Sequence, residues 1–266
     1  MLSQFTHAII ILSAIVGNLI AIKRFAYDNK FNTTCDNYIL NTYLYVLLGF
    51  LLTSLFILLT FESKMVNNLV MNTFSSWLSI IIFIVLYYGS LILFNKVNPK
   101  NNIQLHLMWL VLILFFSILL YFPIKLSVHM NFLSLAIGIT LVLVSILSYV
   151  GIKYGKDLIK HDWDIYLRYG LFALIIIYFL LPLLMPLLIK LGLEQNTIYI
   201  ILSLISIIVF SLLIMSYNKK LNERSRLCYK NNNPNYPQES VGLIVKIMNI
   251  LIDIINLLGR NSRSRK

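Results

Sequence analysis

The chain has 266 residues, of which 59% are hydrophobic and 12% are charged, so it has too few polar side chains to cover a water-soluble globule of this size. A net charge of +12 would favour a nucleic-acid partner in a soluble protein, but here the basic residues lie between apolar runs and indicate membrane topology instead. The runs continue for about twenty residues without period-two alternation. They predict an all-α, polytopic transmembrane helical bundle, because helices satisfy their own backbone groups in lipid.

Seven major membrane segments are predicted, preceded by one shorter apolar segment. The shorter segment, Ala8 to Ile22, is compatible with a short span, an interfacial helix or an uncleaved anchor, and it lacks the basic leader and cleavage site of a signal peptide. The major segments run from Thr42 to Phe61, Phe74 to Phe94, Ile103 to Ile124, Phe132 to Val150, Tyr169 to Ile189, Ile198 to Tyr217 and Val241 to Leu258. We therefore expect an N-terminal segment over 1–34, a transmembrane domain over 35–260 and a basic tail over 261–266.

Two features of the later segments predict local geometry. Pro182 and Pro186 remove two backbone donors inside the fifth major segment, which predicts a kinked helix there. Residues 218–240 form the longest polar stretch of the chain and contain several asparagines and two prolines. This composition predicts a flexible loop.

Basic residues are divided unevenly between the two sides of the predicted membrane, with fourteen on one side and three on the other. The positive-inside rule then places the connections at 95–102, 151–168 and 218–240 in the cytosol or its equivalent. The tail is also basic, although a seventh full crossing would place it on the opposite side from the other basic residues. Either the last segment is re-entrant or the tail is an exception to the positive-inside rule. The fourteen are Lys23, Arg24, Lys30, Lys96, Lys100, Lys153, Lys156, Lys160, Arg168, Lys219, Lys220, Arg224, Arg226 and Lys230, and the three are Lys64, Lys125 and Lys190.

The chain lacks the sequence signatures of enzymes and metal proteins. No zinc-ligand spacing, Gly-rich phosphate loop, nucleophile arrangement or pair of carboxylates within a span occurs. The sequence thus predicts no enzymatic activity, no cofactor and no metal site. Cys35 and Cys228 both fall in connections on the basic side, where a reducing cytosol disfavours disulfides, so both are predicted to be free thiols.

Asp253 is the one acidic residue within an apolar segment. An ionised carboxylate in hydrocarbon costs about 2.5 to 3.5 kcal/mol on insertion scales, so such residues face a bundle interior or a wet cavity and are functional by default. Lys246, Asn249, Asp253 and Asn256 follow the spacing i, i+3, i+7 and i+10, which places them on one face of a helix. The opposite face is made of Ile, Leu, Val and Met.

Two interpretations of this polar face remain open. It either joins helices through hydrogen bonds, with Asp253 neutral or paired to Lys246, or it forms a protonatable gate or cation site. The preceding segment is the most polar available partner, and its polar residues are Ser203, Ser206, Ser211, Ser216 and Tyr217. Gln104 and His106 form a second, weaker patch, in which a packing role for His106 is favoured.

The stretch MNILIDIIN, Met248 to Asn256, followed by LLGR, resembles the terminal signature of the Bax inhibitor family. In that signature an Asn, an Asp four residues later and an Asn three after that lie in a helix with a Leu-Leu-Gly-Arg-like end. Weaker likenesses follow in collinear order over roughly residues 35–260. They are Asn41 to Ser54, Asn98 to Leu105, Ala136 to Asp157 and Ile207 to Leu221, which resemble the family's first span, the entry to its third, its fourth and its sixth.

The resemblance implies a seven-helix bundle with the last helix at its centre, a pH-sensitive calcium leak and restraint of cell death. In many members two aspartates, one ending the sixth helix and one in the last, share a proton and set the pH response. The second of them corresponds to Asp253. The first falls at Tyr217 or Asn218, where this chain has no acid. The pKa of a lone carboxyl group depends on desolvation and on its hydrogen-bond donors alone, whereas two close carboxyl groups also shift the pKa of each other.

The leading hypothesis is a Bax-inhibitor-like membrane protein that mediates or modulates a pH-sensitive passive calcium or cation leak. The alternative is a non-conducting membrane scaffold or a diverged subunit of a larger assembly, and a proton-coupled transporter comes third because it would need further buried ionisable groups. We expect an endoplasmic reticulum, Golgi or mitochondrial bilayer, calcium ions and other membrane proteins as partners, and no nucleic acid. The residues assigned to the ion pathway or to pH sensing are Asp253, Asn249, Asn256, Tyr217, Asn218 and Lys246.

Overall fold

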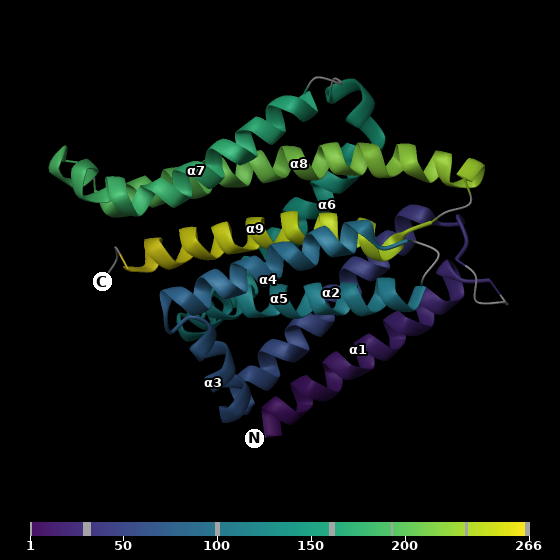
Figure 1. Cartoon of the computed structure of the whole chain (residues 1–266), viewed down its shortest axis with the longest axis horizontal. Helices are drawn as coiled ribbons and strands as arrows, with labels where there is room; N and C mark the ends of the chain where they lie inside the picture. The colour runs from purple at the N-terminus through teal and green to yellow at the C-terminus, as the bar shows by residue number, and fades with distance from the viewer. Residues whose placement is uncertain are drawn as a thin grey trace. The chain divides into compact units, whose positions relative to one another are not determined.

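The computed structural model describes residues 2–28, 33–98, 102–159, 163–192, 194–231 and 234–263. Within these ranges the chain forms nine helices and no strand, apart from an isolated bridge between Tyr27 and Thr33 (Figure 1). The helices are α1 (Leu2–Ala26), α2 (Tyr38–Glu62), α3 (Lys64–Thr73), α4 (Trp77–Lys96), α5 (Asn102–His129), α6 (Leu133–Leu158), α7 (Trp163–Lys190), α8 (Gln195–Asn231) and α9 (Tyr236–Arg263).

Seven of the described helices, α1, α2, α4, α5, α6, α8 and α9, are long and apolar enough to cross a membrane. The helix α7 is apolar enough as well, but its two parts, Ile165–Tyr178 and Leu183–Lys190, meet at 78°. Pro182 explains this bend, because it has no N–H to donate to the carbonyl of Tyr178. The predicted all-α polytopic bundle is confirmed, and so is the kink in the fifth major segment.

Both ends of the chain contain longer helices than the sequence suggested. The helix α1 has 25 residues, and its part Thr6–Ala26 is long and apolar enough to cross a membrane, so the helix is not limited to the short segment expected over Ala8–Ile22. The helix α9 is unbroken over Tyr236–Arg263 and is likewise long enough to cross, which favours a full crossing over a re-entrant loop. Arg265 and Lys266 of the predicted tail lie outside the described residues.

The prediction of a flexible loop over residues 218–240 is wrong. The helix α8 has 37 residues and continues to Asn231, because Lys, Leu, Glu and Arg support helix as well as apolar residues do. The helix α9 then begins at Tyr236, where the side chain of Asn235 accepts a hydrogen bond from the backbone N–H of Gln238 at 3.2 Å and caps the first turn. Asn232 and Asn233, which helped to suggest the loop, lie outside the described residues.

A short helix, α3, occupies a connection that the sequence left without structure. Ser63 starts it, since its hydroxyl accepts a hydrogen bond from the backbone N–H of Val66 at 3.4 Å. Val70 on its inner face is fully buried, and Asn67 accepts a hydrogen bond from the hydroxyl of Tyr121 on α5 at 3.0 Å. The helix is short and carries three asparagines, so it forms no apolar run in the sequence.

The chain folds as two compact units. The first contains residues 1–121 and 223–244, and the second contains residues 122–222 and 245–266. Aromatic side chains fill the first unit: Tyr45 packs edge-on against Trp109 and stacks on Tyr236. Trp109 also donates a hydrogen bond to the hydroxyl of Ser240 on α9 at 2.8 Å, so its indole N–H is satisfied inside the core.

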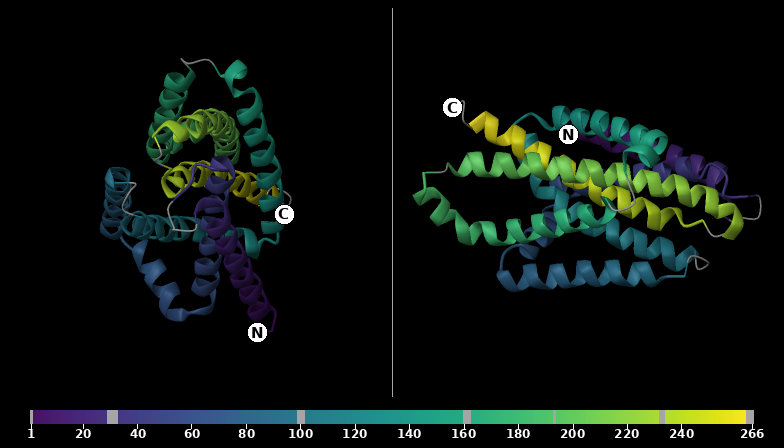
Figure 2. Two further views of the ribbon diagram at one scale, coloured as in Figure 1. Left: turned by 90° about the vertical axis from the view of Figure 1, so that its right-hand side faces the viewer. Right: turned by 90° about the horizontal axis from the view of Figure 1, so that it is seen from above.

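In the second unit α6 and α7 lie on either side of α8, and α7 and α8 run side by side (Figure 2). Leu181 and Met185 of α7 form a core cluster with Leu202 of α8. On the other side, Gly151 and Gly155 of α6 face α8 at the small-xxx-small spacing that lets membrane helices approach closely.

Contacts within each unit relate the basic connections to one another. In the first unit Gln238 at the start of α9 donates to the side chain of Asn95 at the end of α4 at 3.1 Å. In the second unit Asn222 of α8 donates to the carbonyl of Ile152 in α6 at 3.0 Å, and Lys219 donates to the carbonyl of Ile159 at 2.7 Å. Within its own unit, each contact agrees with a shared membrane side for the two connections that it joins, and a common side for all three connections stays a prediction. Lys30, Lys100 and Lys160 lie outside the described residues.

Replacing Gly151 by valine is expected to destabilise the second unit by about 1–3 kcal/mol, the usual cost of overpacking. A Cβ at this position would lie 2.7 Å from the backbone oxygen of Met215, and a backbone atom cannot move aside as a side chain can. Gly138→Val is the matched control, because it lies on the same helix and a Cβ there meets nothing within 4 Å. Thermal unfolding in detergent should show a lower midpoint for Gly151→Val alone. Equal midpoints for both variants would contradict the close approach of α6 and α8.

Candidate functional site

Asp253 lies in the second half of α9 and is 5% exposed. It faces two helices that precede α9 in the chain. Ser206 of α8 donates a hydrogen bond to its Oδ2 atom at 2.5 Å, and Tyr178 of α7 donates to its Oδ1 atom at 3.4 Å. Each carboxylate oxygen therefore has a hydroxyl donor, which offsets part of the cost of burying the group.

A cavity of about 260 Å³ adjoins this carboxyl group. It is lined by Leu171, Leu174, Tyr178, Ser206, Phe210, Asn249, Ile252, Asp253 and Asn256. The polar members offer one carboxyl, two hydroxyls and two carboxamides, all with oxygen atoms that can face a cation or water, while the remaining members are apolar. Oxygen ligands of this kind suit hard cations such as calcium, although calcium binds six to eight of them.

The sequence over residues 35–263 matches the family described as "Inhibitor of apoptosis-promoting Bax1". The chain belongs to the Bax inhibitor family. The match covers most of the chain and includes Asp253 together with its two hydroxyl donors, whereas α1 precedes it. A comparison with curated protein sequences finds no match.

In this Bax inhibitor family protein, three of the predicted site residues lie together. Asn249 and Asn256 line the cavity beside Asp253, as their helical spacing indicated. Asn249 also donates a hydrogen bond to the carbonyl of Val245 one turn earlier in α9, at 2.7 Å. The expectation that the preceding polar segment supplies a partner is confirmed, because Ser206 is that partner.

The other three predicted site residues lie apart from the cavity lining. The ammonium group of Lys246 lies 4.3 Å from the centre of the Tyr217 ring, so the structure pairs these two residues with each other rather than with Asp253. Asn218 is fully buried and donates to the hydroxyl of Ser148 at 3.4 Å and to the carbonyl of Ile214 at 3.0 Å. Tyr217 and Asn218 are the two positions at which the family's other aspartate was expected. Among the described contacts, neither residue supplies an oxygen atom to Asp253.

Tyr178 is the residue of the site that the sequence analysis missed. It is a single tyrosine within a long apolar segment, where a packing role is the ordinary interpretation. A clue was present in Pro182, four residues later, because a proline there bends α7 at Tyr178. Only the packing of α7 on α8 and α9 places this hydroxyl beside a carboxyl group.

His106 belongs to a hydrogen-bonded cluster in the first unit. Its Nε2 atom lies 2.8 Å from the hydroxyl of Tyr45 and 3.3 Å from that of Tyr27, and the two hydroxyls are 3.0 Å apart. The donor and acceptor in each pair depend on the imidazole tautomer. The expectation of a satisfied histidine within the helix packing agrees with this geometry.

The prediction that Cys35 and Cys228 are free thiols is wrong. The two residues form a disulfide within the first unit, across 193 positions of sequence, with Cα atoms 5.8 Å apart. The long helix α8 carries Cys228 to the segment ahead of α2, which the expected loop would not have done. Nearby, Tyr236 donates to the backbone carbonyl of Thr34, and Arg224 pairs with Glu239 at 2.5 Å.

Proposed function

We propose that this protein mediates or modulates a pH-sensitive passive calcium or cation leak across an intracellular membrane and thereby restrains cell death. The observation that carries the proposal is the buried carboxyl group of Asp253, which borders a cavity with both polar and apolar lining residues between α7, α8 and α9. Membership of the Bax inhibitor family gives it further support. We propose no enzymatic activity and no cofactor.

The physical argument concerns the charge of Asp253. A carboxylate in the interior of a membrane bundle requires a proton, a counter-ion or strong donors to remain there. Two hydroxyl donors offset only part of that requirement. The cavity beside the carboxyl group leaves room for a cation or water, so a cation favours the ionised form and a proton displaces the cation. Competition of this kind makes a leak depend on pH.

A non-conducting membrane scaffold or a diverged subunit of a larger assembly is the second candidate. Asn218 favours it, since this residue is a neutral amide packed against Ser148 on α6. A pair of close carboxylates would couple two titrations and give a steep response, whereas a single group gives a shallow one. Under this candidate the polar contacts of Asp253 join helices and carry no ion.

Calcium flux into liposomes tests the proposal with the wild-type protein. The full chain is reconstituted with a calcium dye inside the vesicles, and flux is followed between about pH 5 and pH 8, the range in which physiological pH sensors titrate. Flux above that of empty liposomes, with a dependence on pH, is the expected result. Flux equal to that of empty liposomes over the whole range would exclude the leak and leave the scaffold.

A further inference from the structure

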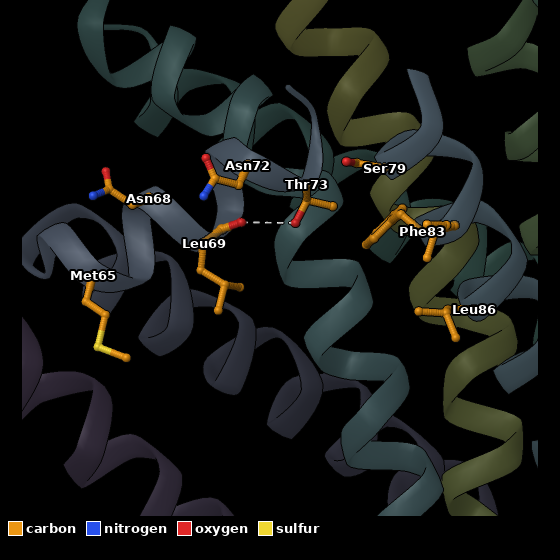
Figure 3. A pocket seen from close by; sticks show the side chains of 9 residues that line it. Met65, Asn68, Leu69, Asn72, Thr73, Ser79, Phe83 and Leu86 are labelled. Atoms are coloured by element: carbon orange, nitrogen blue, oxygen red, sulfur yellow. Dashed lines mark hydrogen bonds between the residues drawn. The ribbon is translucent and has the colours of Figure 1, made fainter. Parts of the chain in front are cut away.

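A groove in the first unit lies between α3 and the first turns of α4, and it shares no lining residue with the cavity beside Asp253. Five residues of α3 and four of α4 line it, and the hollow measures about 600 Å³, within the range of small-molecule sites. Figure 3 shows the two rows of side chains. The lining residues are Met65, Asn68, Leu69, Asn72, Thr73, Ser79, Ile82, Phe83 and Leu86.

The spacing of these residues produces the groove. On α3 they follow i, i+3, i+4, i+7 and i+8, and on α4 they follow i, i+3, i+4 and i+7, so each helix turns one continuous face toward the hollow. The base is rigid, because Phe83 is 7% exposed and its ring packs against Phe74 and Phe115. The hydrogen bond from Tyr121 to Asn67 holds α3 in place on the same unit.

The chemistry of the lining is amphipathic and uncharged. Asn68 and Asn72 point to one side of α3, and Met65 and Leu69 point to the other (Figure 3). The side-chain amides of Asn68 and Asn72 have no hydrogen-bond partner among the residues that the structure describes, whereas Thr73 donates to the carbonyl of Leu69 at 3.1 Å. An occupant needs polar groups without net charge at one end and hydrocarbon at the other.

The position of the groove in the chain suits an occupant from the membrane that has both polar and hydrocarbon parts. The helix α3 connects the end of one span, α2, to the start of another, α4, and short amphipathic helices between spans commonly lie in the interfacial plane. Trp77 at the start of α4 is 83% exposed and Met65 is 80% exposed. Exposed tryptophan is typical of the level of the lipid headgroups, so the groove opens at the boundary between headgroups and acyl chains.

We propose that this groove binds a membrane glycerophospholipid. The glycerol ester region lies against Asn68 and Asn72, and one acyl chain follows Leu69, Phe83 and Leu86 into the hydrocarbon. Recognition is through the neutral ester groups, because the lining contains no Lys or Arg that would select an anionic phosphate. The site is separate from the leak proposed above and stands or falls independently of it.

A photoactivatable phosphatidylcholine with a diazirine on one acyl chain tests the proposal in vesicles of phosphatidylcholine. Illumination followed by peptide mapping should place most of the label in residues 65–86. Leu69→Trp combined with Leu86→Trp fills the groove and should reduce that label by about tenfold. Ile84→Trp is the matched control, since Ile84 is 45% exposed on α4 but does not line the groove, and it should label as the wild type does.

A second variant separates specific binding from general contact with lipid. Asn68→Leu with Asn72→Leu keeps the groove open and removes its polar groups, so it should also lower the label. The proposal would be overturned if the label were spread evenly over the exposed apolar helices, or if the filled variant were labelled as strongly as the wild type. Either result would mean that the probe reports only contact with the surrounding lipid. Displacement of the probe by phosphatidylglycerol more readily than by unlabelled phosphatidylcholine would overturn recognition through the neutral ester groups. Identical elution profiles show that each variant is folded.

Discussion

Asp253→Asn is expected to abolish the pH dependence of calcium flux while leaving the protein folded and inserted. Asparagine has nearly the same size as aspartate but cannot ionise. Its amide oxygen can accept a hydrogen bond from one of the hydroxyls of Ser206 and Tyr178, and its NH2 group can donate to the oxygen of the other. Under the proposed leak, the charge that would draw a cation into the cavity is therefore lost at every pH. Flux measured between about pH 5 and pH 8 should become flat and fall to the lowest value that the wild type reaches.

Asp157→Asn is the matched control for this substitution. Asp157 is an exposed carboxylate near the end of α6 and does not line the cavity, so its loss should leave the pH profile unchanged. Tyr178→Phe and Ser206→Ala each remove one donor to Asp253 and should shift the profile without flattening it. A wild-type profile in Asp253→Asn would assign the pH response to another group and leave Asp253 with a packing role.

Removal of the disulfide is expected to lower the free energy of unfolding by about 2–4 kcal/mol, the typical contribution of such a bond. Cys35→Ser combined with Cys228→Ser frees the segment ahead of α2 from the end of α8. The thermal unfolding midpoint should fall in the double variant, and a reductant should lower the midpoint of the wild type to the same value. The reductant should not change the double variant, which serves as the control.

The state of these cysteines also tests the orientation in the membrane. The positive-inside rule places Cys35 and Cys228 on the cytosolic side, where a reducing environment opposes a disulfide. A bridged species in non-reducing mass spectrometry of protein taken from its native membrane would put this side in an oxidising compartment and would reverse the orientation inferred from charge. Two free thiols there would instead uphold the charge rule and contradict a bridge in the native membrane.

The sequence predicted those parts of the structure that depend on local pattern. Apolar runs located the spans, the spacing from Lys246 to Asn256 gave one face of α9, and the serines of α8 indicated a partner for Asp253. The end of α8 could not be found in this way, because a helix that leaves the bilayer needs no apolar residues. Likewise, the Cys35–Cys228 bridge depends on where α8 ends, which hydropathy does not report.

The remaining differences have the same physical origin. The helix α3 is held by Val70, by a cap from Ser63 and by a hydrogen bond to Tyr121, and none of these is visible as a run of apolar residues. Tyr178 reaches Asp253 only because α7 packs beside α8. Contacts between helices decide these features, and a single sequence contains no direct record of which helices meet.

The length of α8 has a mechanical consequence at the membrane surface. At 1.5 Å per residue its 37 residues extend about 55 Å, and even a tilt of about 40° leaves about 42 Å along the membrane normal, against about 30 Å of hydrocarbon. At least one end of α8 must therefore extend beyond the hydrocarbon, into the headgroup layer or the water. Lys219, Lys220, Arg224 and Arg226 lie on its C-terminal part, and each basic residue near an anionic leaflet contributes about 1 kcal/mol of attraction. The lipid charge of that leaflet thus acts on the C-terminal part of α8, which the Cys35–Cys228 bridge ties to the segment ahead of α2.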